Sequence, residues 1–337
     1  MGQDVKREAN IHPHIGYTHN NPMYTAKMDP SYRSVNLLPP ILALAIVAIS
    51  TASIFIRYAQ YDGAPSLVIA ALRLSIATAL LAPVVVKNHL LELRSIKTTQ
   101  LAYAAGSGIF LAIHFSAWIT SLEFTSVASS ALFVSTGPLW VAVLSPLLIN
   151  EKLPTIALAG VGLAMAGGIL IALVDGCGEF SIRVCMQEID FLQNQEVLRG
   201  NFLALVGAWA VSGYLMVGRK ARAGMSLIPY VFLVYGIAAL ALNAYLALTH
   251  VTPWNYSPLA YLWIFLLSAI PQLVGHSTLN WALKFMPASL VSVVTLSEPI
   301  GAAILAYFLF QETPNPTSIL GGVLILLGIF FAARSSK

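Results

Sequence analysis

Residues 151–168 read EKLPTIALAGVGLAMAGG, and residues 312–329 read ETPNPTSILGGVLILLGI. At a constant offset of 161 residues, the matching pairs are Glu151 with Glu312, Gly160 with Gly321, Gly167 with Gly328, and, upstream, Pro138 with Pro299. The matches fall on residues with mechanical roles: a proline inside an apolar span, a carboxylate at its end, and two glycines in the following span. The sequence therefore indicates an internal duplication.

The composition is that of a membrane protein. Of the 337 residues, 58% are hydrophobic and 9% are charged, whereas a soluble globular domain carries roughly 25% charged residues. The net charge of +4 is not gathered into a basic run or a basic and aromatic patch, so we expect no nucleic-acid partner. The chain length suits about ten spans of roughly 20 residues with short loops.

Apolar windows of spanning length follow one another at short intervals from Leu37. Runs of this length without alternating polar residues favour helices over barrel strands. We expect an all-α integral membrane protein with ten transmembrane helices, near residues 37–57, 65–86, 100–121, 126–149, 154–173, 199–217, 227–248, 259–280, 288–310 and 315–333.

Five helices per repeat make the second repeat enter the membrane from the opposite side, so the two five-helix repeats are inverted. We assign the first repeat to 37–173, an acidic outer loop to 174–198 and the second repeat to 199–333. The polar segments 1–36 and 334–337 are expected to be cytoplasmic tails, the first of them disordered. No apolar run of signal-peptide length precedes Leu37, so segment 1–36 does not resemble a cleaved leader.

The distribution of positive charge predicts the orientation. With the amino terminus inside, most of the 18 lysine and arginine residues fall on the cytoplasmic face, including Lys97 and Lys220. We therefore expect both termini to be cytoplasmic, in a bacterial inner membrane or a plasma membrane.

Two charged residues lie at membrane depth, where charges usually mark transport paths. Glu298 is in the ninth span, immediately before Pro299, whose ring disrupts the helix. A substrate or coupling-ion contact and a purely structural role are both open for Glu298, and protons are the candidate coupling ion. Arg73 in the second span needs a partner, for which Glu298, backbone carbonyls and a path to the interface are alternatives.

The third and eighth spans carry further polar and aromatic candidates for substrate binding or coupling. His114 and Trp118 are four residues apart and project from one helix face. The eighth span has a polar stripe with a neighbouring tryptophan, formed by Gln272, His276, Asn280 and Trp281. Such a stripe should face a cavity or another helix. Neutral core histidines and tryptophans that anchor at the interface are the structural alternatives.

Three prolines, Pro138, Pro271 and Pro299, are candidate hinges. The two cysteines, Cys177 and Cys185, both lie in the outer loop, where a disulfide and two free thiols are equally open readings. No cysteine or histidine spacing indicates a metal site. We find no Walker loop, HExxH, nucleophile elbow or dinucleotide fingerprint, and so expect no catalytic residues, no cofactor and no enzyme.

These residues resemble the drug/metabolite transporter superfamily, and within it the EamA-type ten-helix carriers. The resemblance is carried by the Glu298–Pro299 pair, by Arg73, and by a span-terminal glutamate followed by a glycine-bearing helix in each half. It implies a secondary active transporter that exports small metabolites such as amino acids or amines by alternating access. It also implies a central cavity built mainly by helices three, four, eight and nine. Gly137 stands opposite Glu298 in the first half, so any charge coupling is asymmetric.

Several alternatives stay open. An importer or exchanger of phosphorylated sugars would need several cations at membrane depth, and only Arg73 qualifies. An uncoupled facilitator and a non-transporting scaffold or receptor subunit are the others. A water-accessible pocket that touches His114, His276 and Glu298 would favour transport. The sequence leaves the oligomeric state open.

Overall fold

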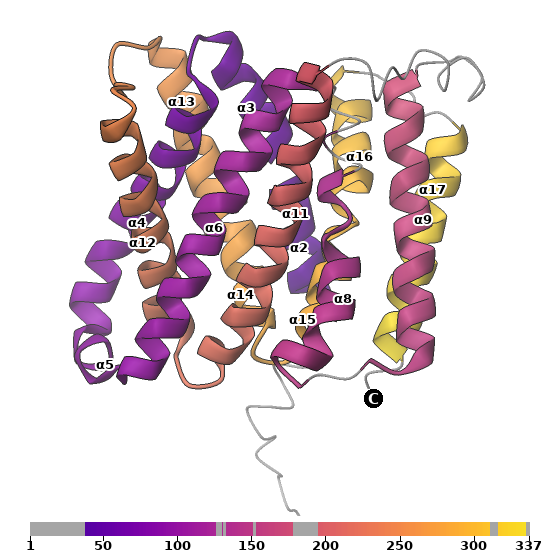
Figure 1. The fold of residues 1–337 in the computed structure, drawn as a ribbon, viewed down its shortest axis with the longest axis horizontal. Coiled ribbons are helices and arrows are strands. Elements are labelled where there is room, and N and C mark those ends of the chain that lie inside the picture. Colours follow the sequence, from indigo (N-terminus) through magenta and orange to yellow (C-terminus); the bar gives the residue numbers. More distant parts are fainter. Residues whose placement is uncertain are drawn as a thin grey trace, which may run out of the picture. The chain divides into compact units, whose positions relative to one another are not determined.

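The computed structural model describes residues 38–125, 130, 133–150, 153–177, 195–310 and 316–334. All of them belong to a unit that begins at Leu37. Every regular element within these ranges is a helix (Figure 1). The predicted all-α fold is therefore confirmed.

The helices of the first repeat are α2 (Leu38–Ser50), α3 (Ala52–Tyr61), α4 (Ser66–Asn88), the short α5 (Leu90–Ser95), α6 (Thr98–Phe124), α8 (Gly137–Leu148) and α9 (Thr155–Cys177). Those of the second are α11 (Gln195–Arg222), α12 (Leu227–Leu248), α13 (Pro258–Leu267), η1 (Ser268–His276), α14 (Ser277–Ala282), α15 (Ala288–Thr295), α16 (Glu298–Phe310) and α17 (Pro316–Arg334). Helices α9 and α11 both extend into the segment that we assigned to the outer loop.

Six helical segments in the described ranges are long and apolar enough to cross a membrane: Leu38–Tyr61, Ser66–Asn88, Thr98–Phe124, Gln195–Arg222, Leu227–Leu248 and Pro258–Ala282. Three shorter apolar helices accompany them, Gly137–Leu148, Thr155–Leu170 and Ile319–Ala332. Large apolar side chains such as Leu147 and Phe308 are 76% and 69% exposed, whereas Arg73 and Gln272 are fully buried. Because apolar groups outside and polar groups inside suit a lipid environment, the chain is a multi-pass membrane protein.

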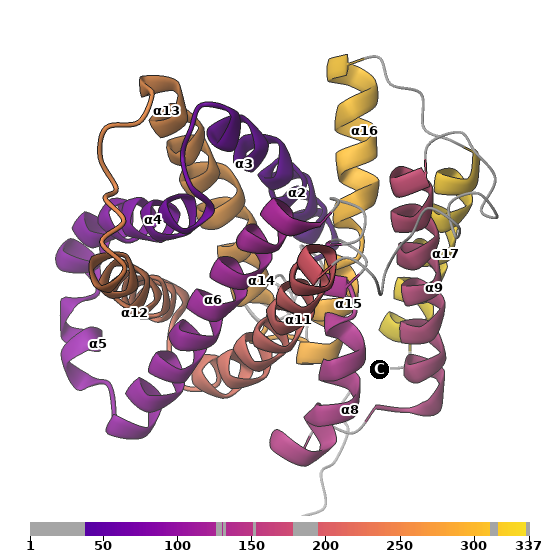
Figure 2. The same cartoon turned by 45° about the horizontal axis from the view of Figure 1, so that its top comes forward.

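Helices of one repeat pack largely against helices of the other. Helix α6 lies along α11, and its counterparts in the second repeat, α13 and η1, pack against α3 and α2. Helix α4 packs against its own counterpart α12, and α9 packs against α17, a pair that lies side by side in both views (Figures 1 and 2). Exchanging the repeats reproduces these pairings, as expected for an inverted duplication.

In the contact between α9 and α17, the symmetry between the repeats can be followed at individual residues. A Cβ atom on Gly160 would lie 2.6 Å from the carbonyl oxygen of Gly328, and one on Gly167 would meet the carbonyl oxygen of Gly321. The 161-residue offset turns one of these contacts into the other. The four repeated glycines therefore permit a close antiparallel approach of the two helices.

The fourth and ninth spans are broken at equivalent places, although we expected continuous helices. The chain turns immediately before α8 and again between α15 and α16. Each new helix has a proline in its first turn, Pro138 in α8 and Pro299 in α16. Proline lacks an N–H group and clashes with the preceding turn, but it is tolerated at a helix start. The helix therefore stops and restarts at these points instead of bending.

The eighth span contains a different irregularity. Its central segment, η1, is a π-helix that includes Pro271. A π-helix uses i→i+5 hydrogen bonds, is rare, and is frequently found at functional sites. The wider turn changes the angular spacing between Gln272, His276 and Asn280. The single stripe expected from their spacing of four assumes a regular α-helix.

Candidate functional site

Polar side chains from four spans meet within the helical bundle, where those of His276 and Glu298 are half-buried and the others are buried. We call this set the buried polar cluster: Arg73 of α4, His114 of α6, Gln272 and His276 of η1, Asn280 of α14 and Glu298 of α16. Electrostatic interactions link Arg73 to Glu298, His114 and His276. Spans that are distant in sequence thus bring candidates from both repeats together.

Arg73 is fully buried and is held from two directions. Its Nε donates a hydrogen bond to Gln272 Oε1 at 2.7 Å, and its guanidinium carbon lies 3.9 Å from the centre of the Phe115 ring. Arg73 and Glu298 interact electrostatically, but no ion pair joins them in the described part of the chain. The direct hydrogen-bond partner of Arg73 is therefore Gln272. It is neither Glu298 nor a backbone carbonyl, the partners that the sequence suggested.

His114 is buried between α6 and α11. Its Nδ1 lies 2.9 Å from the carbonyl oxygen of Gly207 on α11. Its ring stacks with Trp118, with centroids 6.0 Å apart and planes 10° apart. His276 packs edge to face against Phe115, with centroids 5.3 Å apart. Aromatic rings therefore separate and orient the two histidines.

The polar residues of the eighth span contact α11 and α12. The Tyr235 hydroxyl donates to the Gln272 carbonyl oxygen at 3.3 Å and lies 3.5 Å from Asn280 Nδ2. Asn280 Nδ2 also donates to the Tyr214 hydroxyl and to the His276 carbonyl oxygen. Trp281 packs against Phe285 in the turn that follows α14, with centroids 4.8 Å apart. The structure thus ties Gln272 and Asn280 to buried tyrosines.

The two helix breaks are held by equivalent hydrogen bonds. Ser50 Oγ donates to the carbonyl oxygen of Glu298 at 2.9 Å, and Ser212 Oγ donates to that of Gly137 at 3.0 Å. Each serine also contacts a carbonyl oxygen one turn back on its own helix. Glu298 occupies the first turn of α16, where the helix dipole stabilises a carboxylate. Each break is therefore attached to the opposite repeat.

Several buried polar residues were missed by the sequence analysis. Arg222, two residues after Lys220, is 2% exposed and donates through Nε to the Asn280 carbonyl oxygen at 3.0 Å. Tyr214, Tyr230 and Tyr235 are buried with their hydroxyl groups hydrogen-bonded. Tyrosine in an apolar run carries no sign of which way its hydroxyl points. The serines at the breaks gave equally little signal.

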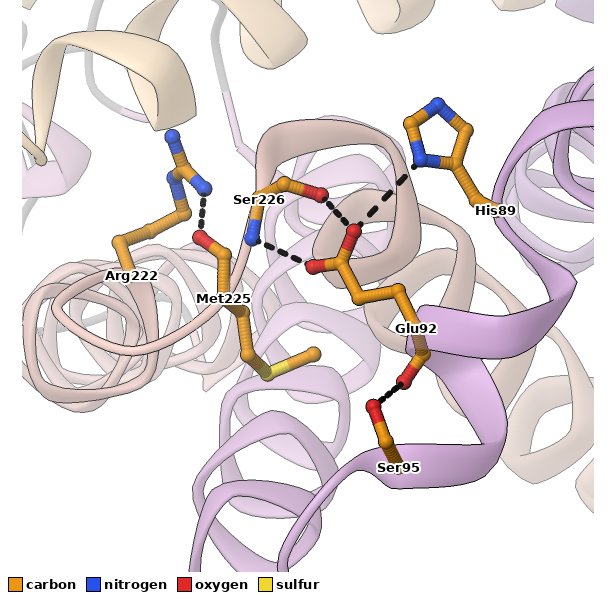
Figure 3. Close-up of polar contacts among 6 residues, drawn as sticks. All are labelled: His89, Glu92, Ser95, Arg222, Met225 and Ser226. Carbon is orange, nitrogen blue, oxygen red and sulfur yellow. Dashed lines mark hydrogen bonds and ion pairs between the residues drawn. The ribbon is translucent and has the colours of Figure 1, made fainter.

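A second polar cluster joins α5 to the start of α12 (Figure 3). Glu92 Oε1 accepts from the Ser226 backbone N–H at 2.9 Å, and Glu92 Oε2 accepts from Ser226 Oγ at 2.6 Å. His89 Nδ1 lies 3.6 Å from Glu92 Oε2. Burial alone would raise the pKa of the Glu92 carboxyl, but the hydrogen bonds from Ser226 outweigh it and hold the pKa below its usual value of 4.5.

The same end of the bundle brings two basic loops together. Gln100 Nε2 donates to the Gly224 carbonyl oxygen at 2.7 Å, which places the segments of Lys97 and Lys220 side by side. At the other end of α4, Trp263 Nε1 donates to Asp62 Oδ2 at 3.0 Å. The arrangement agrees with the shared face that the charge distribution predicts for the two lysines.

Some expectations lie outside the described residues. These include any Cys177–Cys185 disulfide, because Cys185 is not described, and the positions of Glu151 and Glu312. Within the described ranges, no group of three or more His, Cys, Asp or Glu residues is arranged to hold a metal ion.

Comparison with known families matches the EamA-like transporter family twice, over residues 39–173 and 198–334. The two matches coincide with the two repeats. An uncharacterized transporter of Archaeoglobus fulgidus is 24% identical over 230 residues, which cover 68% of this chain and 75% of that protein. The uncharacterized transporter YdfC of Bacillus subtilis is 25% identical over 207 residues, or 61% of this chain and 62% of YdfC.

The fold also has a counterpart among solved structures. A crystal structure of a protein at 19% sequence identity superposes with a TM-score of 0.71, covering 89% of this chain and 98% of its own. At this identity, the likeness supports the fold alone.

Proposed function

Because the chain belongs to the EamA-like transporter family, we propose that it is a secondary transporter that moves a small metabolite by alternating access. The two inverted halves exchange inward-open and outward-open arrangements around the buried polar cluster. Export of an amino acid, an amine or a similar small metabolite is the proposed direction and cargo class, supported by the family resemblance.

The observation that carries this proposal is the matched pair of helix breaks. Discontinuous spans are where carriers of inverted-repeat architecture place their binding sites, because unwound backbone is tolerated only around a cavity or inside protein. Here each break is hydrogen-bonded to a helix of the other repeat, Glu298 to Ser50 and Gly137 to Ser212. A movement of one half relative to the other therefore acts directly on both breaks.

The proposed coupling residue is Glu298, and the proposed coupling ion is a proton. The first-half equivalent of Glu298 is Gly137, so the carboxylate is present at one break and absent at the other. Glu298 interacts electrostatically with Arg73 and lies in the first turn of α16. It changes the charge of the buried polar cluster when it gains or loses a proton. Pro138, Pro271 and Pro299 stay the proposed hinges.

Counterflow in proteoliposomes tests the proposal. Vesicles that contain the purified protein are loaded with an unlabelled metabolite, diluted into a trace of the labelled compound, and assayed over a metabolite panel at two pH values. A carrier produces saturable accumulation of the label for at least one compound. Flux without saturation would identify an uncoupled facilitator, and no flux for any compound would favour a scaffold or receptor subunit.

A further inference from the structure

We propose that Arg73 and Gln272 form a recognition site for a carboxylate group on the transported molecule. This inference rests on the proposed transport function and specifies the chemistry of the cargo.

The first argument is the set of hydrogen-bond donors that have no partner. Arg73 Nη1, Arg73 Nη2 and Gln272 Nε2 are buried and make no hydrogen bond within the described residues. A buried donor left unpaired costs about 1–3 kcal/mol, and a charged one costs more. All three atoms can only donate, so the group that satisfies them must be rich in acceptors.

The orientation of Gln272 follows from Arg73. A guanidinium has no acceptor, so the amide atom that meets Arg73 Nε at 2.7 Å must be the oxygen. The amide nitrogen of Gln272 is thereby directed elsewhere and remains a donor. Arg73 thus contributes two free donors, and Gln272 contributes a third.

The second argument is the geometry that remains available on the guanidinium. Its Nε edge is occupied by Gln272, and one face lies over Phe115 at 3.9 Å. The terminal edge with Nη1 and Nη2 is free, and this edge matches the two oxygens of a carboxylate in a bidentate pair. Because Arg73 is already held at two points, little side-chain freedom is lost when a ligand binds.

The third argument is charge, which favours a carboxylate over a phosphate. Within the buried polar cluster, Arg73 interacts electrostatically with one carboxylate, Glu298. When Glu298 is protonated, a monoanionic cargo group balances Arg73, whereas a dianionic phosphate would leave one negative charge that no cation of the buried polar cluster balances. Asn280 Oδ1, also buried without a partner in the described ranges, is an acceptor suited to an N–H or O–H group of the same cargo.

The test compares matched pairs of compounds in the counterflow assay. Each panel acid, drawn from amino acids, hydroxy acids and simple monocarboxylates, is assayed beside its amide, its decarboxylated amine where one exists, and phosphorylated sugars. We expect the transported compounds to be carboxylates, with the amides at least about tenfold weaker as competitors, which corresponds to about 1.4 kcal/mol. Saturable transport confined to amines, amides or sugar phosphates would overturn the carboxylate site while leaving the transport proposal intact.

Two variants locate the preference. Arg73→Lys keeps the charge but removes the two-pronged donor edge. Gln272→Glu keeps the size and places a carboxylate beside Arg73, so it tests the site even where Arg73→Lys does not fold. Both are expected to lose the preference for acid over amide by at least about tenfold. Gln60→Glu, the same change near the end of α3, is the matched control and should keep it.

The outcomes separate the two proposals. Variants that fold, as judged by a single size-exclusion peak, and retain the wild-type preference for the acid would contradict the carboxylate site. Absence of saturable counterflow for every compound in wild-type vesicles would instead contradict the transport function itself.

Discussion

Arg73 and Glu298 carry the charges of the buried polar cluster, and they are held in different ways. Arg73 is anchored through its side chain by Gln272 and Phe115. Glu298 is anchored through its backbone by Ser50, at the point where the ninth span restarts. The Arg73 side chain is therefore fixed on the surface of α4, whereas Glu298 lies at the break between α15 and α16. This difference suits a fixed binding group and a mobile coupling group.

At this scale, the first prediction concerns Glu298→Gln. The amide keeps the size of the side chain but cannot exchange a proton. We expect pH-gradient-driven transport to fall at least about tenfold, equivalent to about 1.4 kcal/mol, while the protein still inserts into the membrane. Transport in reconstituted vesicles with and without a pH gradient measures the effect.

The control for this change is Glu123→Gln, at the exposed end of α6, where the carboxylate accepts a single 3.3 Å bond from the Ser66 N–H. It should leave the pH dependence unchanged. Wild-type rates and pH dependence in Glu298→Gln would remove this carboxylate from the mechanism.

A second prediction concerns Glu92, whose pKa is held below 4.5 by Ser226. A lowered pKa in the folded state means that the carboxylate stabilises the fold above pH 4.5 and that this contribution is lost as the pH falls through the lowered value. Because Glu92 is about one-third exposed, we expect Glu92→Gln to lose only about 1 kcal/mol at neutral pH, or roughly 2 °C in Tm.

Thermal unfolding of the detergent-solubilised protein from pH 7 down to pH 3 measures this difference. The gap between wild type and Glu92→Gln should close as the pH drops below 4.5. A gap that is constant across the range would show that the negative charge contributes nothing. Glu123→Gln, which neutralises a carboxylate that accepts one longer hydrogen bond, should shift Tm less.

Among the helices, α9 and α17 can approach closely because glycines, which have no side chain, lie at their contact. Apolar packing against another helix gives no net advantage over packing against lipid, so close approach and dispersion contacts hold membrane helices together. Gly160 and Gly167 let the backbone of α9 reach Gly328 and Gly321. Gly162 of the same helix is exposed, and a Cβ there would meet nothing within 4 Å.

The third prediction compares these two kinds of glycine. Gly160→Ala introduces a methyl group 2.6 Å from the Gly328 carbonyl oxygen, and such overpacking costs about 1–3 kcal/mol. Gly162→Ala gains helix propensity of up to about 1 kcal/mol without a clash. We expect Tm to fall in the first variant and to hold or rise in the second. Equal shifts in both would show that the close approach contributes nothing to stability.

At the scale of the whole helical unit, the two repeats are interlocked. Most helices have their principal neighbours in the other repeat, and the Ser50 and Ser212 contacts cross between repeats at each break. Neither repeat can move without changing its contacts with the other, because the helices of each repeat pack against helices of the other. Rocking of the repeats would therefore rearrange both breaks in the same step.

The fourth prediction tests the topology of this unit. In a Cys177→Ser, Cys185→Ser background, Lys97→Cys and Lys220→Cys should react with an impermeant maleimide only after the membrane is opened. Tyr61→Cys should react in intact cells. The native Tyr61 is 78% exposed, and α4, about 34 Å long at 1.5 Å per residue, separates it from the end of the bundle that holds Lys97. Labelling of Lys97→Cys and Lys220→Cys from opposite sides would contradict the inverted repeat.

The positions of the spans, the duplication and the family resemblance could be read from the chain alone. Span length, the 161-residue offset and the placement of Pro138 and Pro299 are properties of local or repeated sequence. The prolines also indicated where the fourth and ninth spans are irregular, although not that the helices end there. The π-helix at Pro271 could not be foreseen, because a proline inside a helix is compatible with a bend, a break or a wider turn.

The amino-acid sequence is sufficient to predict a two-repeat membrane bundle with a charged interior, because transfer of apolar helices into lipid and the cost of buried charge depend on each segment's own residues. Which groups meet in that interior depends on how the helices pack in three dimensions. Gln272 is 199 residues from Arg73, and Ser50 is 248 residues from Glu298. Hydrogen bonds across such separations depend on the relative positions of packed helices, and no local pattern of the chain encodes those positions.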